Sequence, residues 1–162
     1  MRLQYIISII IFFPLLLIQT TVIPLIAING IVPDLILILL VFYSLRFGQV
    51  YGTILGFVFG FLFDLITGSL LGSTMFSKTL AGFIAGYFYN EKNPDIYKKS
   101  VFFSLIVLLC AIIDSVVYSF FTNINFNSNF LTLIFDQGML PGFYTAVFSL
   151  IVIIFYPRSR FS

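Results

Sequence analysis

The stretch GQVYGTILGFVFGFLFDLITGSLLG, residues 48–72, decides how this chain can fold. Small residues recur in it at every fourth position, and a single carboxylate takes one of the steps: Gly48, Gly52, Gly56, Gly60, Asp64, Gly68 and Gly72. A step of four residues returns to nearly the same face of an α-helix, so these positions form one slanting stripe. Most residues between them are large and apolar. The stretch therefore predicts a helix that is apolar on most sides and almost free of side chains along one.

The composition indicates an integral membrane protein. Of the 162 residues, 60% are hydrophobic and 9% are charged, whereas soluble domains carry about 25% charged residues. The apolar runs are continuous, as in FFSLIVLLCAIIDSVVYSFF, and do not alternate as the strands of a membrane barrel would. We therefore expect an all-α integral membrane protein that forms a single domain over residues 1–162.

Polar and glycine-containing breaks divide the chain into six apolar segments. The first could be a signal peptide, but neither an A-x-A cleavage site nor a soluble domain follows it. The second rises only about 20 Å against a bilayer core of about 30 Å, which leaves a re-entrant segment as an alternative. A break at Pro141-Gly142 is expected within the last segment. The predicted transmembrane helices cover residues 3–28, 33–46, 49–66, 73–89, 100–121 and 131–155.

The basic residues predict the orientation of these helices. In a six-span arrangement, seven of the eight lie on the side of the N-terminus: Arg2, Arg46, Lys92, Lys98, Lys99, Arg158 and Arg160. Basic residues concentrate on the cytoplasmic side of a membrane, so both termini are expected to be cytoplasmic. A re-entrant hairpin would place Arg46 at membrane depth, which favours six full spans.

The remaining charges converge on the outer third of the predicted bilayer. At 1.5 Å per residue, Asp64 lies about 22 Å from the cytoplasmic face, Asp114 lies at a similar height, and Lys78 lies about 8–10 Å below the outer face. We expect these three to form a buried polar cluster in which Lys78 neutralises Asp64 or Asp114. Asp34 and Asp136 lie nearer the outer surface, and we expect each to be solvated separately among lipid headgroups.

Spaced small residues predict close helix packing. The positions concerned are Gly48, Gly52, Gly56, Gly60, Gly82 and Gly86. Small-xxx-small stripes let helix backbones approach each other. Packing of helix 49–66 against helix 73–89 or helix 131–155 is the favoured interpretation over homodimerisation, and the Lys78-Gly82-Gly86 spacing supports the first of these contacts. A groove for a partner's transmembrane helix stays open.

Several functional classes are disfavoured. The chain contains no histidine and one cysteine, Cys110, so we expect no metal site, no cofactor and no His-based nucleophile pair. There is no basic patch for nucleic acid. Two membrane aspartates could indicate an intramembrane protease, but the YD and GxGD motifs are absent and Lys78 would quench the pair. We therefore expect no enzymatic activity.

Residues 33–90 resemble the rod shape-determining protein MreD family of bacteria. The resemblance is carried by Pro33-Asp34, Arg46, Gly48, Gly52, Gly56-Phe57, Gly60, Asp64 and Leu71-Gly72. It implies a non-enzymatic scaffold of the inner membrane that acts in cell elongation and peptidoglycan synthesis among membrane lipids. Its implied partner is MreC, a single-span protein, and through MreC the MreB filament and the RodA–transpeptidase synthase. The implied fold is similar to the substrate-binding component of energy-coupling-factor transporters. A solute- or lipid-binding transporter component that uses the outer pocket is the alternative function.

Overall fold

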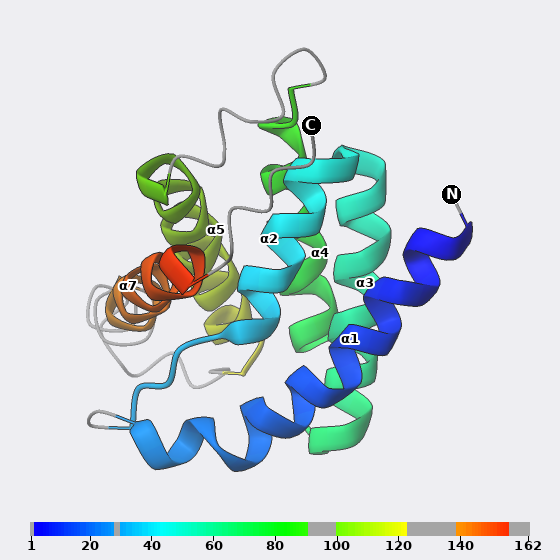
Figure 1. Ribbon diagram of the computed structural model, residues 1–162. Coiled ribbons are helices and arrows are strands. Elements are labelled where there is room, and N and C mark those ends of the chain that lie inside the picture. The colour runs from blue at the N-terminus through cyan, green and yellow to red at the C-terminus, as the bar shows by residue number, and fades with distance from the viewer. Residues whose placement is uncertain (1, 28–29, 91–99, 123–138, 156–162) are drawn as a thin grey trace.

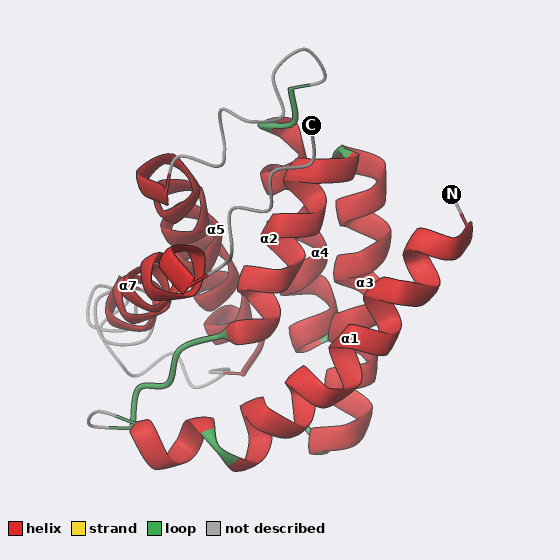
Figure 2. Ribbon diagram, viewed as in Figure 1, coloured by secondary structure: helices red, strands yellow, loops and turns green. Residues whose placement is uncertain are grey.

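The computed structural model describes residues 2–27, 30–90, 100–122 and 139–155, and these residues form a bundle of helices (Figures 1 and 2). This confirms the all-helical prediction for the described part of the chain. The elements are α1 (Arg2–Thr21), the short 3-10 helix η1 (Ile23–Ile26), α2 (Leu35–Phe47), α3 (Gln49–Thr67), α4 (Ser73–Tyr87), α5 (Ser100–Thr122) and α7 (Leu140–Phe155).

Most helix ends lie within two residues of their predicted positions, and the two terminal segments differ. The first helix was predicted to reach residue 28, but α1 ends at Thr21 and η1 follows. Pro24 lies inside η1 and has no N–H with which to continue an α-helix. At the other end, the predicted break at Pro141-Gly142 falls in the first turn of α7. Residues 131–138 of the last predicted helix lie outside the described residues.

Helix α2 is the central helix of the bundle. It contacts α1, α3, α4, α5 and α7, and most of its residues are buried. A helix that is apolar on every side is typical of such an enclosed position. The sequence LILILLVFYSLRF is therefore the signature of a core helix.

Helix α1 crosses α2 and α3 obliquely (Figure 1). Its Phe12 ring stacks on Phe59 of α3 with centroids 4.6 Å apart, and both rings are fully buried. The hydroxyl groups of Ser8 and Tyr51 lie 2.9 Å apart and join the same two helices. On the opposite side of the bundle, α5 packs against α4 and α7.

The outer surface of the bundle is strongly apolar. Large side chains such as Leu25, Val50 and Phe120 are exposed. Within the described residues, α3 (Gln49–Thr67) and the segment Val101–Thr122 are long and apolar enough to cross a membrane. The apolar stretches Ile6–Thr21, Leu35–Phe47 and Leu140–Ile151 are shorter.

Candidate functional site

The glycine stripe of α3 lies against α4. A Cβ atom added at Gly56 would stand 2.8 Å from the carbonyl carbon of Lys78, and one added at Gly60 would stand 2.6 Å from the carbonyl oxygen of Thr74. Gly52 meets the backbone of Gly82 in the same way. The helices run antiparallel with their backbones in contact, as small-residue stripes allow. At these levels α4 itself fills the stripe, which leaves no free surface there for a partner helix.

At the end of the stripe near Gly48, one glycine allows close packing and another makes a turn. Gly86 of α4 packs on the backbone of Gln49, where an added Cβ would lie 2.7 Å from the amide nitrogen. Gly48 stands between α2 and α3 with φ of +94°, a conformation that residues with side chains rarely adopt. Its nearest neighbour is the Tyr89 ring, 3.5 Å from where a Cβ would stand. Gly48 therefore makes the turn that brings α3 back along α2.

Asp64 ends the stripe and caps the next helix. The residue at the N-terminal boundary of α4 is Gly72, which has no side chain to cap it. Asp64 is buried and takes over this role from α3. It accepts hydrogen bonds from the hydroxyl of Ser69 (2.7 Å) and from the backbone N–H groups of Gly72 (2.9 Å), Thr74 (3.3 Å) and Met75 (3.1 Å). A carboxylate is favoured at this end of a helix because the free N–H groups and the helix dipole both attract it.

Loss of this cap is expected to destabilise the protein moderately. Asp64→Ala should lower the free energy of unfolding by about 2 kcal/mol, since buried N–H groups lose their acceptor. The free energy of unfolding of Asp64→Asn should lie between those of wild type and Asp64→Ala, because one oxygen remains as an acceptor while the new amide NH₂ faces N–H groups. Thermal unfolding in detergent measures the order. Thr67→Ala on the exposed side of the same turn is the control, and equal stability of Asp64→Ala and this control would contradict the cap.

Lys78, Asp34 and Asp114 form an ion trio. The Lys78 ammonium group donates to Asp34 Oδ2 and lies 3.2 Å from Asp114 Oδ2. The side chains of Lys78 and Asp114 are 3% and 12% exposed, whereas the Asp34 side chain is 27% exposed. The trio joins α4 to α5 and to the start of α2. Buried charges persist only when they are paired, so the three groups depend on one another.

Four further hydrogen bonds hold Asp34 and its two chain neighbours in place. Its Oδ1 accepts from the N–H of Leu37 at 2.9 Å and so caps α2. The Gln19 amide donates to the carbonyl of Pro33 at 3.0 Å and accepts from Leu35 N–H at 2.9 Å. The N–H of Asp34 donates to the Thr145 hydroxyl at 3.1 Å. Residues of α1, α2 and α7 thus fix one member of the ion trio.

The structure corrects two expectations about this cluster. Lys78 and Asp114 are neighbours as expected, but Asp64 binds the start of α4 and not Lys78. Asp34 was expected among headgroups, yet it pairs with Lys78 because Pro33-Asp34 begins the central helix of the bundle. Asp136 lies outside the described residues. Sequence reasoning missed Thr145, and the only signal for it was a hydroxyl on a mainly apolar helix that also carries Tyr144 and Ser149.

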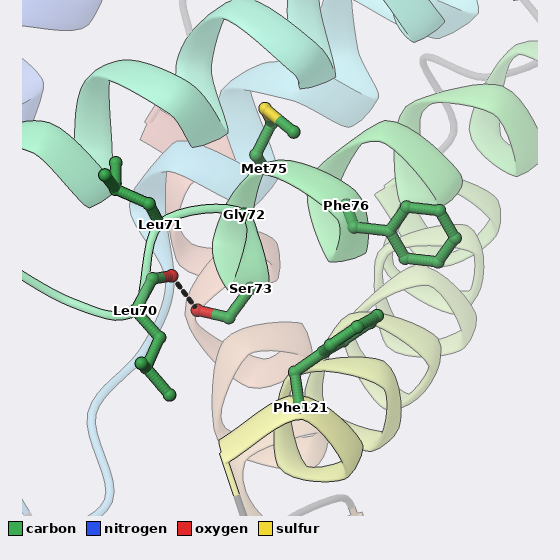
Figure 3. A pocket seen from close by; sticks show the side chains of 7 residues that line it. All are labelled: Leu70, Leu71, Gly72, Ser73, Met75, Phe76 and Phe121. Atoms are coloured by element: carbon green, nitrogen blue, oxygen red, sulfur yellow. Dashed lines mark hydrogen bonds between the residues drawn. The ribbon is translucent and has the colours of Figure 1, made fainter.

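Two hollows lie near this end of the bundle. The larger has a volume of about 530 Å³, and the ion trio forms part of its wall. The smaller, of about 360 Å³, lies between the start of α4 and the end of α5 and is lined mainly by Leu70, Leu71, Met75, Phe76 and Phe121 (Figure 3). The Ser73 hydroxyl beside it donates to the Leu70 carbonyl at 2.8 Å. Among the described residues, no ionisable side chain lines the smaller hollow, so the polar groups belong to the larger one.

Apolar outer faces and helices long and apolar enough to cross a membrane are typical of a helical membrane protein. Comparison with protein families identifies which one: the family model described as rod shape-determining protein MreD matches residues 1–158, so the chain belongs to the MreD family. The match extends well beyond residues 33–90, which carry the motifs that resemble the family, and it includes α1, α5 and α7. No curated protein and no solved structure matches the chain. Membership makes the protein a membrane component that determines rod shape.

Proposed function

We propose that this chain is a non-enzymatic scaffold of the machinery that elongates rod-shaped cells by peptidoglycan synthesis. The observation that carries the proposal is the MreD family match over residues 1–158. The interior supports a structural role, because Asp64 caps a helix and the Lys78 ammonium group is paired with two carboxylates. These polar groups are engaged in contacts that stabilise the fold. An enzyme would instead hold its reactive groups ready for a substrate.

The scaffold is proposed to cross the bacterial inner membrane six times with both termini in the cytoplasm. The arrangement of α2 supports this orientation, since Asp34 caps its first turn and Arg46 lies in its last turn. Asp64 and Lys78 lie toward the Asp34 end of the bundle, as Asp64 binds the start of α4. Arg46 thus lies at the end opposite Asp34, and the positive-inside rule assigns an end with unpaired basic residues to the cytoplasm, whereas Lys78 is paired with carboxylates inside the bundle.

The proposed direct partner is an MreC-like single-span membrane protein, which would connect the scaffold to the MreB filament and the RodA–transpeptidase synthase. The glycine stripe is occupied by α4, so the partner's helix must use an outer face. One exposed apolar position on each of four helices suits a test: Ile10 on α1, Ile54 on α3, Leu105 on α5 and Val147 on α7.

Cysteine crosslinking in membranes tests this proposal. Cys110 is fully buried, and Cys110→Ala gives a background without thiols. Ile10→Cys, Ile54→Cys, Leu105→Cys and Val147→Cys are each combined with single cysteines along the partner's span. We expect crosslinks at one or two adjacent helices and none at the others, because one helix can cover only one face.

Ala85→Cys is the matched control, because Ala85 is fully buried between helices and a thiol there should never reach a partner. Failure of all four exposed positions to crosslink, together with failure of the two proteins to co-purify, would contradict the proposed scaffold.

A further inference from the structure

The larger hollow has the size and the lining of a small-molecule site. Its volume of about 530 Å³ falls within the range of about 300–1,000 Å³ that ligand pockets occupy. Helices α2, α4, α5 and α7 contribute to the wall. The polar lining groups include Ser77, Ser115, Tyr118 and Thr145 as well as the ion trio.

The charges of this wall are unbalanced. One ammonium group, that of Lys78, faces the two carboxylates of Asp34 and Asp114. The start of α2 binds Asp34 Oδ1 and the start of α4 binds Asp64, so among the described residues neither of these helix ends is left to bind Asp114. A carboxylate in excess within an apolar bundle requires a proton or a positively charged group from elsewhere.

One carboxylate oxygen is left without a partner. Asp114 Oδ1 is buried and accepts no hydrogen bond from the residues that the structure describes. The hydroxyl of Ser77 lies close enough to interact with the Asp114 carboxyl group, but its hydrogen bond goes to the Thr74 carbonyl at 3.2 Å. Buried oxygens without a donor are rare and costly, so this one marks a place for a donor that the described chain does not supply.

We propose that the hollow binds a ligand through a protonated primary amine that donates to Asp114. A charge-assisted N–H···O bond would satisfy the free oxygen and balance the excess carboxylate in one contact. A metal ion fits less well, because in the described part of the chain no three ligating side chains of the His, Cys, Asp or Glu type gather together. The two carboxylates repel an anion. This site is separate from the outer helix faces, so the result of the partner-binding test does not decide whether the hollow binds an amine.

The amine could belong to a soluble molecule or to the headgroup of an ethanolamine lipid. Ethanolamine is the probe for the soluble source, and its quaternary analogue choline carries the same charge without an N–H group. The full chain in detergent should show a saturable rise in melting temperature with ethanolamine. Choline should bind about ten-fold more weakly or worse, since it cannot donate to the free oxygen.

Ser115→Leu is the variant that tests the location. Ser115 lines the hollow one residue after Asp114 but is no member of the ion trio, so the added side chain should fill the hollow and leave the trio intact. We expect this variant to fold and to lose the ethanolamine response. Phe120→Leu, at an exposed position of α5 outside the hollow, should keep it.

Nanodiscs distinguish the two sources. If a lipid headgroup occupies the site, protein in phosphatidylethanolamine nanodiscs no longer responds to added ethanolamine, whereas protein in phosphatidylcholine nanodiscs does. If the response persists in both, the ligand is a soluble amine. Equal responses to ethanolamine and choline, equal responses of wild type and Ser115→Leu, or no response in detergent and in phosphatidylcholine nanodiscs would overturn the proposal.

Discussion

Lys78→Met is expected to destabilise the protein strongly, by about 3–5 kcal/mol in the free energy of unfolding. The ammonium group of Lys78 is almost completely buried and is paired with both Asp34 and Asp114. Methionine fills a similar volume, so the loss would come from two carboxylates that no longer face a positive charge. Removal of one partner from a buried ion pair costs far more than the pair itself contributes. Thermal unfolding of the purified protein in detergent measures the effect.

A compensating variant separates the electrostatic cause from a packing defect. Lys78→Met combined with Asp34→Asn and Asp114→Leu removes all three charges, and the asparagine oxygen can still cap α2 in place of Asp34 Oδ1. This triple variant should recover much of the stability, because an uncharged interior replaces an unbalanced one. Phe76→Met on the exposed side of α4 is the control. A triple variant no more stable than Lys78→Met would show that the trio matters through shape and not through charge.

The α3–α4 contact could be predicted from the sequence because its signal is local. A four-residue step of glycines has few uses other than close backbone approach, and Gly82 and Gly86 continue the same spacing on the next helix. The structure places Gly52 against Gly82 and Gly86 against Gln49. The short connection between α3 and α4 makes the two helices antiparallel neighbours, so pattern and chain connectivity agree.

The pairing of the charges could not be predicted in the same way. Distances along the helices gave heights for Asp64, Lys78 and Asp114, but heights do not say which side of a helix a residue occupies. Lys78 has its backbone against Gly56 while its ammonium group reaches α2 and α5. Asp64 stands next to its own turn, where the N–H groups of α4 are the nearest donors. The direction in which a helix turns each of its sides depends on how all the helices pack, and no single segment encodes that packing.

The position of Asp34 illustrates the same limit. The dipeptide Pro33-Asp34 correctly signals the start of a helix, since proline suits the first turn and aspartate caps it. Nothing in that signal shows that the helix is enclosed by five neighbours. The cap of a peripheral helix would face headgroups, whereas the cap of the central helix lies beside Lys78.

Gly56→Leu and Gly60→Leu are expected to prevent α3 and α4 from packing, each with a loss of about 3 kcal/mol or more. The atoms nearest to an added side chain all belong to backbone, and they include the carbonyl carbon of Lys78 at 2.8 Å for Gly56 and the carbonyl oxygen of Thr74 at 2.6 Å for Gly60. Backbone cannot rotate away as a side chain can, so the helices must separate. Separation would also draw Lys78 and the cap on α4 away from their partners, which makes the effect cooperative.

Size-exclusion chromatography and thermal unfolding in detergent measure the amount and stability of folded protein. Gly56→Ala and Gly60→Ala should already be destabilised, although alanine favours helix over glycine by about 1 kcal/mol. Gly142→Ala on α7 is the matched control, because its nearest neighbour is the side chain of Ile112 at 3.1 Å, which can shift by a few tenths of an ångström. Folded and fully stable leucine variants that lose only binding to an MreC-like partner would contradict this packing. They would place the partner in the stripe that α4 fills here, because only a partner's helix would then meet the added side chains.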